Sequence, residues 1–197
     1  MKKRFTVFSL LMIFILSVSA YAGAPTDTVE NTVNRVLDVL RDPKLKSPAA
    51  KETKAEKIRV IYKEMFDEME FSKRTLTRNW NKFTPAQRKE FVDLFERVME
   101  KTYIDKILDY SNEKVVFHKE TMIPDDKAEV QSKIITSSKE VPIFYRMILK
   151  DGKWKVYDVV VENVSLVQNY RTQFNEILAS GTPEQLLETL RKKVKTH

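Results

Sequence analysis

The sequence predicts an α+β fold in which helices come first, antiparallel strands follow and helices return at the end. Apolar residues recur with the helical period of about 3.6 residues over 29–40, 58–69 and 91–108. The period changes to two between 115 and 161, which is typical of strands, and helical spacing returns over 164–194. Strands collected in the middle of a chain favour an antiparallel sheet with helices packed over one face.

Short start and stop signals mark the helices. Asp42-Pro43 ends the first apolar stripe, and a second helix is expected from about Lys51. Leu76 and Trp80 lie four apart on a shorter helical piece. Thr84-Pro85-Ala86-Gln87 is a capping box with proline at the first helical position, and it predicts a long helix that reaches Tyr110.

The same signature returns near the C-terminus. Gly181 ends one helix, whose expected apolar stripe begins at Val164, and Thr182-Pro183-Glu184-Gln185 begins the last helix. The strands between the two helical parts should number four. Two of them are joined by Asp151-Gly152, which favours a tight hairpin with Lys150 opposite Lys153.

This hairpin register predicts which side chains share one face of the sheet. It pairs Leu149 with Trp154, Met147 with Val156, Tyr145 with Asp158 and Ile143 with Val160. The shared face is apolar except for Asp158 and the hydroxyl of Tyr145, so the sheet should present it to the helices.

The first 22 residues have the three parts of a secretory signal. Lys2, Lys3 and Arg4 precede an apolar run from Phe5 to Val18, and Ala20-Tyr21-Ala22 is a small-residue cleavage site. We therefore expect a cleaved signal peptide over 1–22 and one soluble domain over 23–197. Removing these three basic residues lowers the formal net charge from +7 to +4, and the interspersed charges do not indicate a nucleic-acid partner.

The composition excludes several kinds of chemistry. The chain contains no cysteine, so it has neither disulfides nor a lipid-modified cysteine. Its three glycines, Gly23, Gly152 and Gly181, are too dispersed for a phosphate-binding loop, a dinucleotide fingerprint or a hydrolase nucleophile elbow. The two histidines, His118 and His197, do not form a zinc-binding motif, so we expect no metal site.

One polar pair could carry chemistry. Asp158 interrupts an apolar strand, and the expected register places it beside Tyr145. An aspartate and a tyrosine that face an apolar cavity are groups used in proton transfer of the ketosteroid-isomerase type. Alternatively, Asp158 is a buried acceptor that nearby donors satisfy. The residues alone leave both interpretations open.

Several segments together resemble the MlaC family of periplasmic phospholipid-binding proteins, which also includes toluene-tolerance auxiliary proteins. The most specific segment is Trp154-Lys155-Val156-Tyr157-Asp158-Val159, continued by Val164-Ser165-Leu166-Val167 and Asn169-Tyr170-Arg171 with Phe174. Phe66-Asp67, Leu76 with Trp80, Thr84 to Arg88, Phe91, Phe95, Tyr103 and Tyr110 occur in the family's order. Family members usually have glycine where this chain has Thr77 and Asn163.

The resemblance implies a fold related to the nuclear-transport-factor-two-like cone, in which a curved four-stranded sheet and helices enclose a pocket for phospholipid tails. It implies a periplasmic carrier with phospholipid as cargo, and neither an enzyme nor a holder of another cofactor. It also implies two partners: an inner-membrane ABC transporter complex with an MCE-domain subunit, and an outer-membrane lipoprotein–porin complex. Carriage of lipid between them would maintain the lipid asymmetry of the outer membrane.

The resemblance and the apolar stripes together suggest the residues that line the pocket. The candidates are Phe95, Val98, Met99, Tyr103, Ile134, Ile143, Tyr145, Met147, Val160, Val164, Val167 and Phe174. Arg171 or Lys155 would lie near the lipid phosphate. Two alternatives are a proton-transfer enzyme that uses Asp158 as base and Tyr145 as donor, and a protein-binding adaptor without a small ligand.

Overall fold

A computed structural model describes residues 24–110 and 113–196. The expected signal peptide over 1–22 and the expected boundary at residue 23 lie outside the described residues. Within the two described ranges, no helix combines the length and the apolar character that crossing a bilayer requires.

The helices follow the signals in the sequence closely. They are α1 (Pro25–Arg41), α2 (Lys51–Met65), α3 (Glu68–Leu76), α4 (Pro85–Leu108), α5 (Leu166–Ser180) and α6 (Pro183–Thr196). Short 3-10 turns cover Pro43–Leu45, Pro48–Ala50 and Thr77–Lys82. At the start of α4 the Thr84 hydroxyl accepts from the Gln87 backbone N–H, and the Gln87 side chain accepts from the Thr84 N–H, so the predicted capping box is confirmed.

The strands form one antiparallel sheet in chain order. They are β1 (Lys114–Ile123), β2 (Lys127–Ile135), β3 (Glu140–Lys150), β4 (Lys153–Val161) and β5 (Val164–Ser165). The predicted α+β class is confirmed, with five strands in place of four. Val164 belongs to β5 and not to the following helix, because Ser165 caps that helix by accepting a hydrogen bond from the Gln168 N–H at 3.0 Å.

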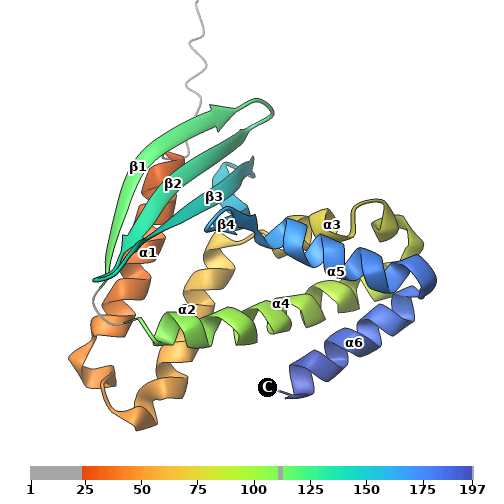
Figure 1. Ribbon diagram of the computed structural model, residues 1–197, viewed down its shortest axis with the longest axis horizontal. Helices are drawn as coiled ribbons and strands as arrows, with labels where there is room; N and C mark the ends of the chain where they lie inside the picture. The colour runs from red at the N-terminus through yellow and green to blue at the C-terminus, as the bar shows by residue number, and fades with distance from the viewer. Residues whose placement is uncertain (1–23, 111–112, 197) are drawn as a thin grey trace, which may run out of the picture.

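Two regions share helix α4 (Figure 1). In one region the sheet curves over α1, α2 and the C-terminal half of α4. In the other, which we call the helical lobe, the N-terminal half of α4 packs with α3, α5 and α6. The aromatic side chains of the lobe contact one another, and the rings of Phe71 and Phe95 stack with centroids 5.4 Å apart.

Backbone conformation explains the two positions at which relatives usually have glycine. Thr77 follows α3 with φ 49° and ψ −126°, and Asn163 has φ 66° in the turn between β4 and β5. Glycine adopts both conformations without a steric penalty. Asparagine tolerates positive φ well, whereas a β-branched threonine is strained there. Asn163 therefore fits its turn, whereas the backbone at Thr77 is strained.

Candidate functional site

A cavity of about 370 Å³ lies between the sheet, α1, α2 and the C-terminal half of α4. Its volume falls within the range of small-molecule sites. Almost all of the side chains on its wall are aliphatic or aromatic, so the cavity favours an apolar occupant.

The sheet supplies one wall of the cavity through alternating side chains. The wall contains Ile143 and Tyr145 of β3, and Val159 and Val161 of β4. These residues are cross-strand pairs: Ile143 lies opposite Val161, and Tyr145 lies opposite Val159. Their side chains therefore leave the same face of the sheet.

Helices α1 and α2 supply the opposite wall. Val33, Val36 and Leu40 recur along α1, and Tyr62 and Phe66 come from the end of α2. Tyr62 and Phe66 stack on each other with ring centroids 4.2 Å apart.

A backbone contact fixes the end of this wall. The N–H of Asp67, the residue that follows Phe66, donates to the carbonyl of Val156 on β4 at 2.9 Å. The sheet thus holds the turn between α2 and α3 in place beside the cavity.

Helix α4 changes role along its length. Phe91, Leu94 and Phe95 belong to the core of the helical lobe. One to three turns later, Met99, Tyr103 and Ile107 line the cavity. The helix is continuous from Pro85 to Leu108, so it couples the packed lobe rigidly to the cavity wall.

Three tyrosines on the cavity wall, Tyr62, Tyr103 and Tyr145, are uncharged at physiological pH. Burial raises the pKa of Tyr103 to about 12, and burial likewise raises the pKa of Tyr145 to about 12, although a hydrogen bond with Ser132 opposes that shift. Burial also raises the pKa of Tyr62 well above its ordinary value. These rings contribute apolar surface and neutral hydroxyls.

An acidic cluster lies behind Tyr62, where α2, α3 and α4 meet. Burial, together with the neighbouring carboxylates Glu96 and Glu100, raises the pKa of Glu68 to about 7, although a hydrogen bond with Tyr62 opposes that shift. Burial also raises the pKa of Glu100, whose side chain borders the cavity, whereas Lys63 opposes that shift. Lys63 pairs with Glu96 at 2.8 Å, so the cluster is only partly neutralised.

The predicted hairpin register is confirmed near the turn and wrong beyond it. Lys150 pairs with Lys153, Leu149 with Trp154 and Met147 with Val156, as expected. A bulge then leaves Tyr157 without a partner, so Arg146 lies opposite Asp158 and Tyr145 lies opposite Val159. The one-residue shift sends Asp158 to the face that points away from the cavity. The expected Tyr145–Asp158 and Ile143–Val160 pairs do not form.

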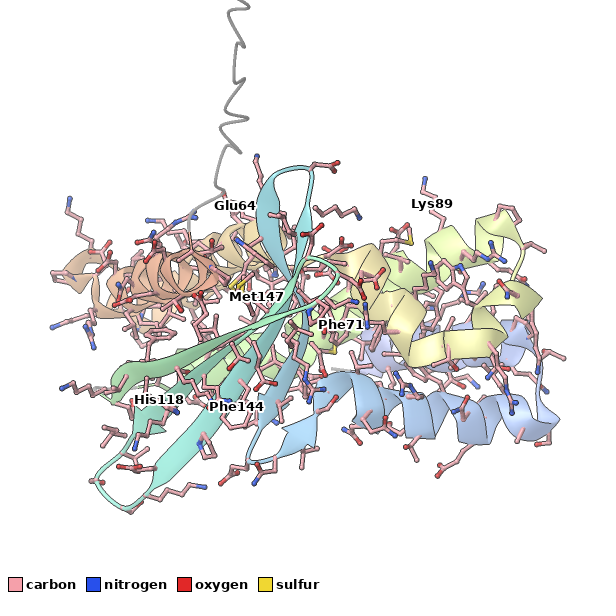
Figure 2. All side chains as sticks on the ribbon, turned by 90° about the horizontal axis from the view of Figure 1, so that it is seen from above. Glu64, Phe71, Lys89, His118, Phe144 and Met147 are labelled. Atoms are coloured by element: carbon pink, nitrogen blue, oxygen red, sulfur yellow. The ribbon has the colours of Figure 1, made fainter. Side chains whose placement is uncertain are left out.

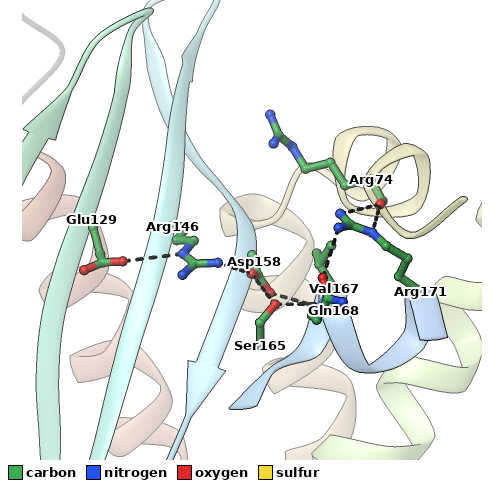
Figure 3. Close-up of polar contacts among 8 residues, drawn as sticks. All are labelled: Arg74, Glu129, Arg146, Asp158, Ser165, Val167, Gln168 and Arg171. Atoms are coloured by element: carbon green, nitrogen blue, oxygen red, sulfur yellow. Dashed lines mark hydrogen bonds and ion pairs between the residues drawn. The ribbon is translucent and has the colours of Figure 1, made fainter. Parts of the chain in front are cut away.

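Asp158 is a buried acceptor with three donors (Figure 3). Its Oδ2 accepts from Arg146 Nη1 at 3.1 Å and from Ser165 Oγ at 2.6 Å, and its Oδ1 accepts from the Val167 N–H at 3.0 Å. Arg146 also contacts Glu129. The carboxylate therefore joins β3, β4 and the start of α5, which is the structural role that the sequence left open as an alternative.

Comparisons with known proteins agree with this architecture. Residues 30–192 match the family described as MlaC protein. The chain belongs to the MlaC family. The toluene tolerance protein ttg2D of Pseudomonas putida is 26% identical over 159 residues, which cover 80% of this chain and 74% of that protein.

Two further relatives share parts of the sequence or the fold. The intermembrane phospholipid transport system binding protein MlaC of Haemophilus influenzae is 29% identical over 107 residues, which cover 51% of this chain and 50% of that protein. The structure of a phospholipid-binding protein from Ralstonia solanacearum, solved in complex with a phospholipid, matches with a TM-score of 0.74 and 22% identity. That match covers 85% of this chain and 95% of the Ralstonia chain, and it shows a shared fold.

The structure places only some of the predicted lining residues of this MlaC-family chain at the cavity. Met99 and Tyr103 of α4, Ile134 of β2, and Ile143 and Tyr145 of β3 lie on its wall. These five residues come from elements that are distant in the sequence. Their contact with lipid remains a prediction.

The other predicted residues lie outside this cavity. Phe95, Val98, Val167 and Phe174 belong to the core of the helical lobe, because α5 and α6 cover that part of α4. Met147 has no exposed surface and packs with Val29 and Val156 under the sheet. A charge at Met147 would therefore disrupt packing and would not probe the cavity.

Two valines were misplaced for local reasons. The bulge at Tyr157 turns Val160 away from the cavity, onto the same face as Asp158. Val164 in β5 is 55% exposed, because the helix begins only after it.

Sequence reasoning missed the α1 and α2 wall. The apolar stripes of both helices were evident, but nothing in the sequence distinguished a stripe that packs fully from one that borders a cavity.

The two suggested phosphate neighbours lie in different places. Arg171 donates to the backbone carbonyl of Arg74 at 3.0 and 3.2 Å and to Gln168 at 3.0 Å, and it is not on the cavity wall. Lys155 borders a smaller polar hollow that adjoins the cavity and donates to the carbonyl of Glu64.

Metal binding has no support in the two described ranges. Within 24–110 and 113–196, no three carboxylate or imidazole side chains are grouped as a metal ion would need. His118 is exposed on β1, next to a register shift between Phe117 and Lys119.

Proposed function

We propose that this chain is a periplasmic phospholipid carrier, which shuttles lipid between inner- and outer-membrane complexes and so maintains the lipid asymmetry of the outer membrane. The observation that carries the proposal is the apolar cavity of about 370 Å³ beneath the sheet. In this cavity a phospholipid tail would leave water and contact apolar side chains, among them Val36, Phe66, Ile143 and Val159.

The physical need for a carrier follows from the hydrophobic effect. Transfer of acyl chains into water costs about 0.8 kcal/mol per CH₂, so two chains of ordinary length cost on the order of 20 kcal/mol. Free diffusion between membranes is therefore negligible. A carrier must bury the chains about as well as a bilayer does and still release them. Methionines such as Met65 and Met99 suit this exchange because their side chains repack easily.

The relatives support the same function. The Haemophilus protein carries the name of an intermembrane phospholipid transport binding protein, and the Ralstonia structure contains a phospholipid. The proposal extends these properties to this chain. It includes an inner-membrane ABC transporter complex with an MCE-domain subunit and an outer-membrane lipoprotein–porin complex as partners. Export would depend on the signal pattern of residues 1–22.

Lipid analysis tests the proposal directly. The protein is purified from the periplasm without detergent, extracted with organic solvent and analysed by mass spectrometry. We expect phospholipid at roughly one molecule or more per chain. Repeated preparations without phospholipid would contradict the carrier function. A small bound metabolite would instead support an enzyme, and a protein without any ligand would support an adaptor.

A further inference from the structure

A polar hollow of about 280 Å³ adjoins the apolar cavity. It lies between α1, the end of α2 and the β3–β4 hairpin, near Glu64 in Figure 2. Thr32 and Met65 border both spaces, so the polar hollow lies directly beside the apolar wall.

The charge of the hollow is mainly positive. Arg35, Lys153 and Lys155 line it, against the single carboxylate of Glu64. Arg35 pairs with Glu64 at 2.5 Å, and Lys155 donates to the Glu64 carbonyl. Lys153 is exposed beside Gly152 at the tip of the hairpin, and no ion pair within the described ranges holds it. The carboxylate of Glu64 neutralises one of the three cations, so the hollow keeps an excess of positive charge.

The opposite end of the cavity differs in character. Lys106 is the one cation on the described cavity wall, and it lies over the ring of Tyr103 at 5.2 Å. Asp105 and Asp109 are its near neighbours in sequence. The charges at this end are mixed, because Asp105 pairs with Lys51 at 2.9 Å and Arg41 lies 3.4 Å from the hydroxyl of Tyr110 on the cavity wall.

We propose that the polar hollow binds the phosphate group of the phospholipid whose tails occupy the apolar cavity, an inference that rests on the proposed function. Arg35 exchanges Glu64 for the phosphate oxygens, and Lys153 and Lys155 complete the contact. Guanidinium and phosphate match each other in bidentate geometry, which makes Arg35 the strongest contact. The rest of the headgroup lies outside in water.

The absence of native cysteine allows a direct test of headgroup position. Three variants are compared, Lys153→Cys at the hollow, Lys106→Cys at the opposite end and Lys89→Cys on the distant helical lobe (Figure 2). Each is mixed with vesicles that contain phosphatidylethanolamine with a maleimide on its amine, and labelling is followed by intact-protein mass spectrometry. Rates are divided by those with N-ethylmaleimide, which corrects for differences in thiol reactivity.

We expect Lys153→Cys to be labelled at least about tenfold faster than the other two variants, because a bound headgroup has a high effective concentration beside it. Faster labelling of Lys106→Cys would overturn the inference. Lys153→Cys could also be labelled no faster than Lys89→Cys although the protein contains extractable lipid. That result would overturn the inference and leave the proposed function standing. Wild-type protein without lipid would instead contradict the proposed function.

A lipid headgroup and a free phosphate ester share the same chemistry. Maleimide-bearing glycerophosphoethanolamine, which has no acyl chains, distinguishes them. It should label Lys153→Cys at the background rate of Lys89→Cys. Labelling as fast as with the full lipid would mean that the hollow binds phosphate esters independently of the cavity, contrary to the inference.

Discussion

The helical lobe and the sheet region use the same kind of apolar residues to different ends. In the lobe, Phe91 and Phe95 are fully buried and contact Phe174 from α5, so helices close the space around them. In the sheet region, α1 and α2 face the curved sheet across a cavity of about 370 Å³. Apolar composition therefore does not distinguish a packed core from a ligand cavity, and the arrangement of the layers does.

Helix α4 shows the difference within one element. Its apolar stripe runs from Phe91 to Ile107 without a break in period. Contacts with α6 and α3 fill the space around the first half, whereas the sheet prevents such contact around the second half.

Phe95→Ala should destabilise the protein by about 3–5 kcal/mol, because it removes a buried ring from a close-packed core. Urea denaturation of delipidated protein measures the change. Phe66→Ala at the cavity wall removes the same ring and is the matched variant from the sheet region. It should cost less, about 1–2 kcal/mol, since cavity space already adjoins Phe66. Equal losses in the two variants would contradict the contrast between the regions.

Asp158→Asn should destabilise the protein by about 2 kcal/mol while lipid content per folded molecule stays unchanged. The amide keeps one acceptor oxygen, which can serve the Val167 N–H or the Ser165 hydroxyl but not both, because these groups donate to different oxygens of Asp158. It also loses the ion pair with Arg146. Thermal unfolding and lipid extraction on the same preparation separate the two effects. Loss of lipid without loss of stability would indicate that Asp158 has a role at the ligand.

Glu68, which lies between the two regions, should make the free energy of unfolding depend on pH. Its folded pKa of about 7 lies above its ordinary value of 4.5, so the folded protein keeps a proton that the unfolded chain releases between these values. Stability should therefore fall as pH rises from 4.5 to 7 and level off above. Glu68→Gln should remove this decline and stabilise the protein at pH 8 by on the order of 2 kcal/mol.

The control for Glu68 is Glu188→Gln on the exposed face of α6, which should leave the dependence of the urea midpoint on pH unchanged. A wild-type midpoint that rises between pH 4.5 and 7, with Glu68→Gln following the same curve, would contradict the prediction.

Thr77→Gly should stabilise the protein by about 1 kcal/mol, the smallest effect in the set. The gain comes from relief of positive-φ strain at the end of α3 and is reduced by the greater freedom of glycine in the unfolded chain. Thr53→Gly inside the exposed part of α2 is the control, and it should destabilise by about 0.5–1 kcal/mol. Differential scanning calorimetry measures the unfolding temperature of each variant, which should rise for Thr77→Gly and fall for Thr53→Gly.

Local signals in the sequence predicted most of the fold. The capping boxes at Thr84 and Thr182 and the hairpin at Asp151-Gly152 each depend on interactions within a few residues, so the neighbouring sequence is enough to predict them. The family resemblance, which rested on segments such as Trp154 to Val159, is confirmed by the match of residues 30–192 to the MlaC family.

Long-range arrangement could not be predicted in the same way. The bulge at Tyr157 depends on how β4 bends between the sheet and Asp67 of the α2–α3 turn, and no turn residue signals it. The bulge alone explains the misplacement of Val160 and Asp158. Phe95 lies in the lobe core, whereas Met99, four residues later, belongs to that core and also borders the cavity. This difference depends on α6 and the sheet, which lie far away in sequence.

The most direct test of the account enlarges a valine in each region. Val36→Trp places a large ring inside the cavity, whereas Val98→Trp forces one into the packed lobe. Native mass spectrometry then measures bound phospholipid per chain, alongside urea denaturation. We predict that Val36→Trp loses most of its lipid and keeps its stability, and that Val98→Trp loses about 1–3 kcal/mol of stability through overpacking and keeps lipid in the folded fraction. Normal lipid content in Val36→Trp would contradict the claim that this cavity holds the lipid.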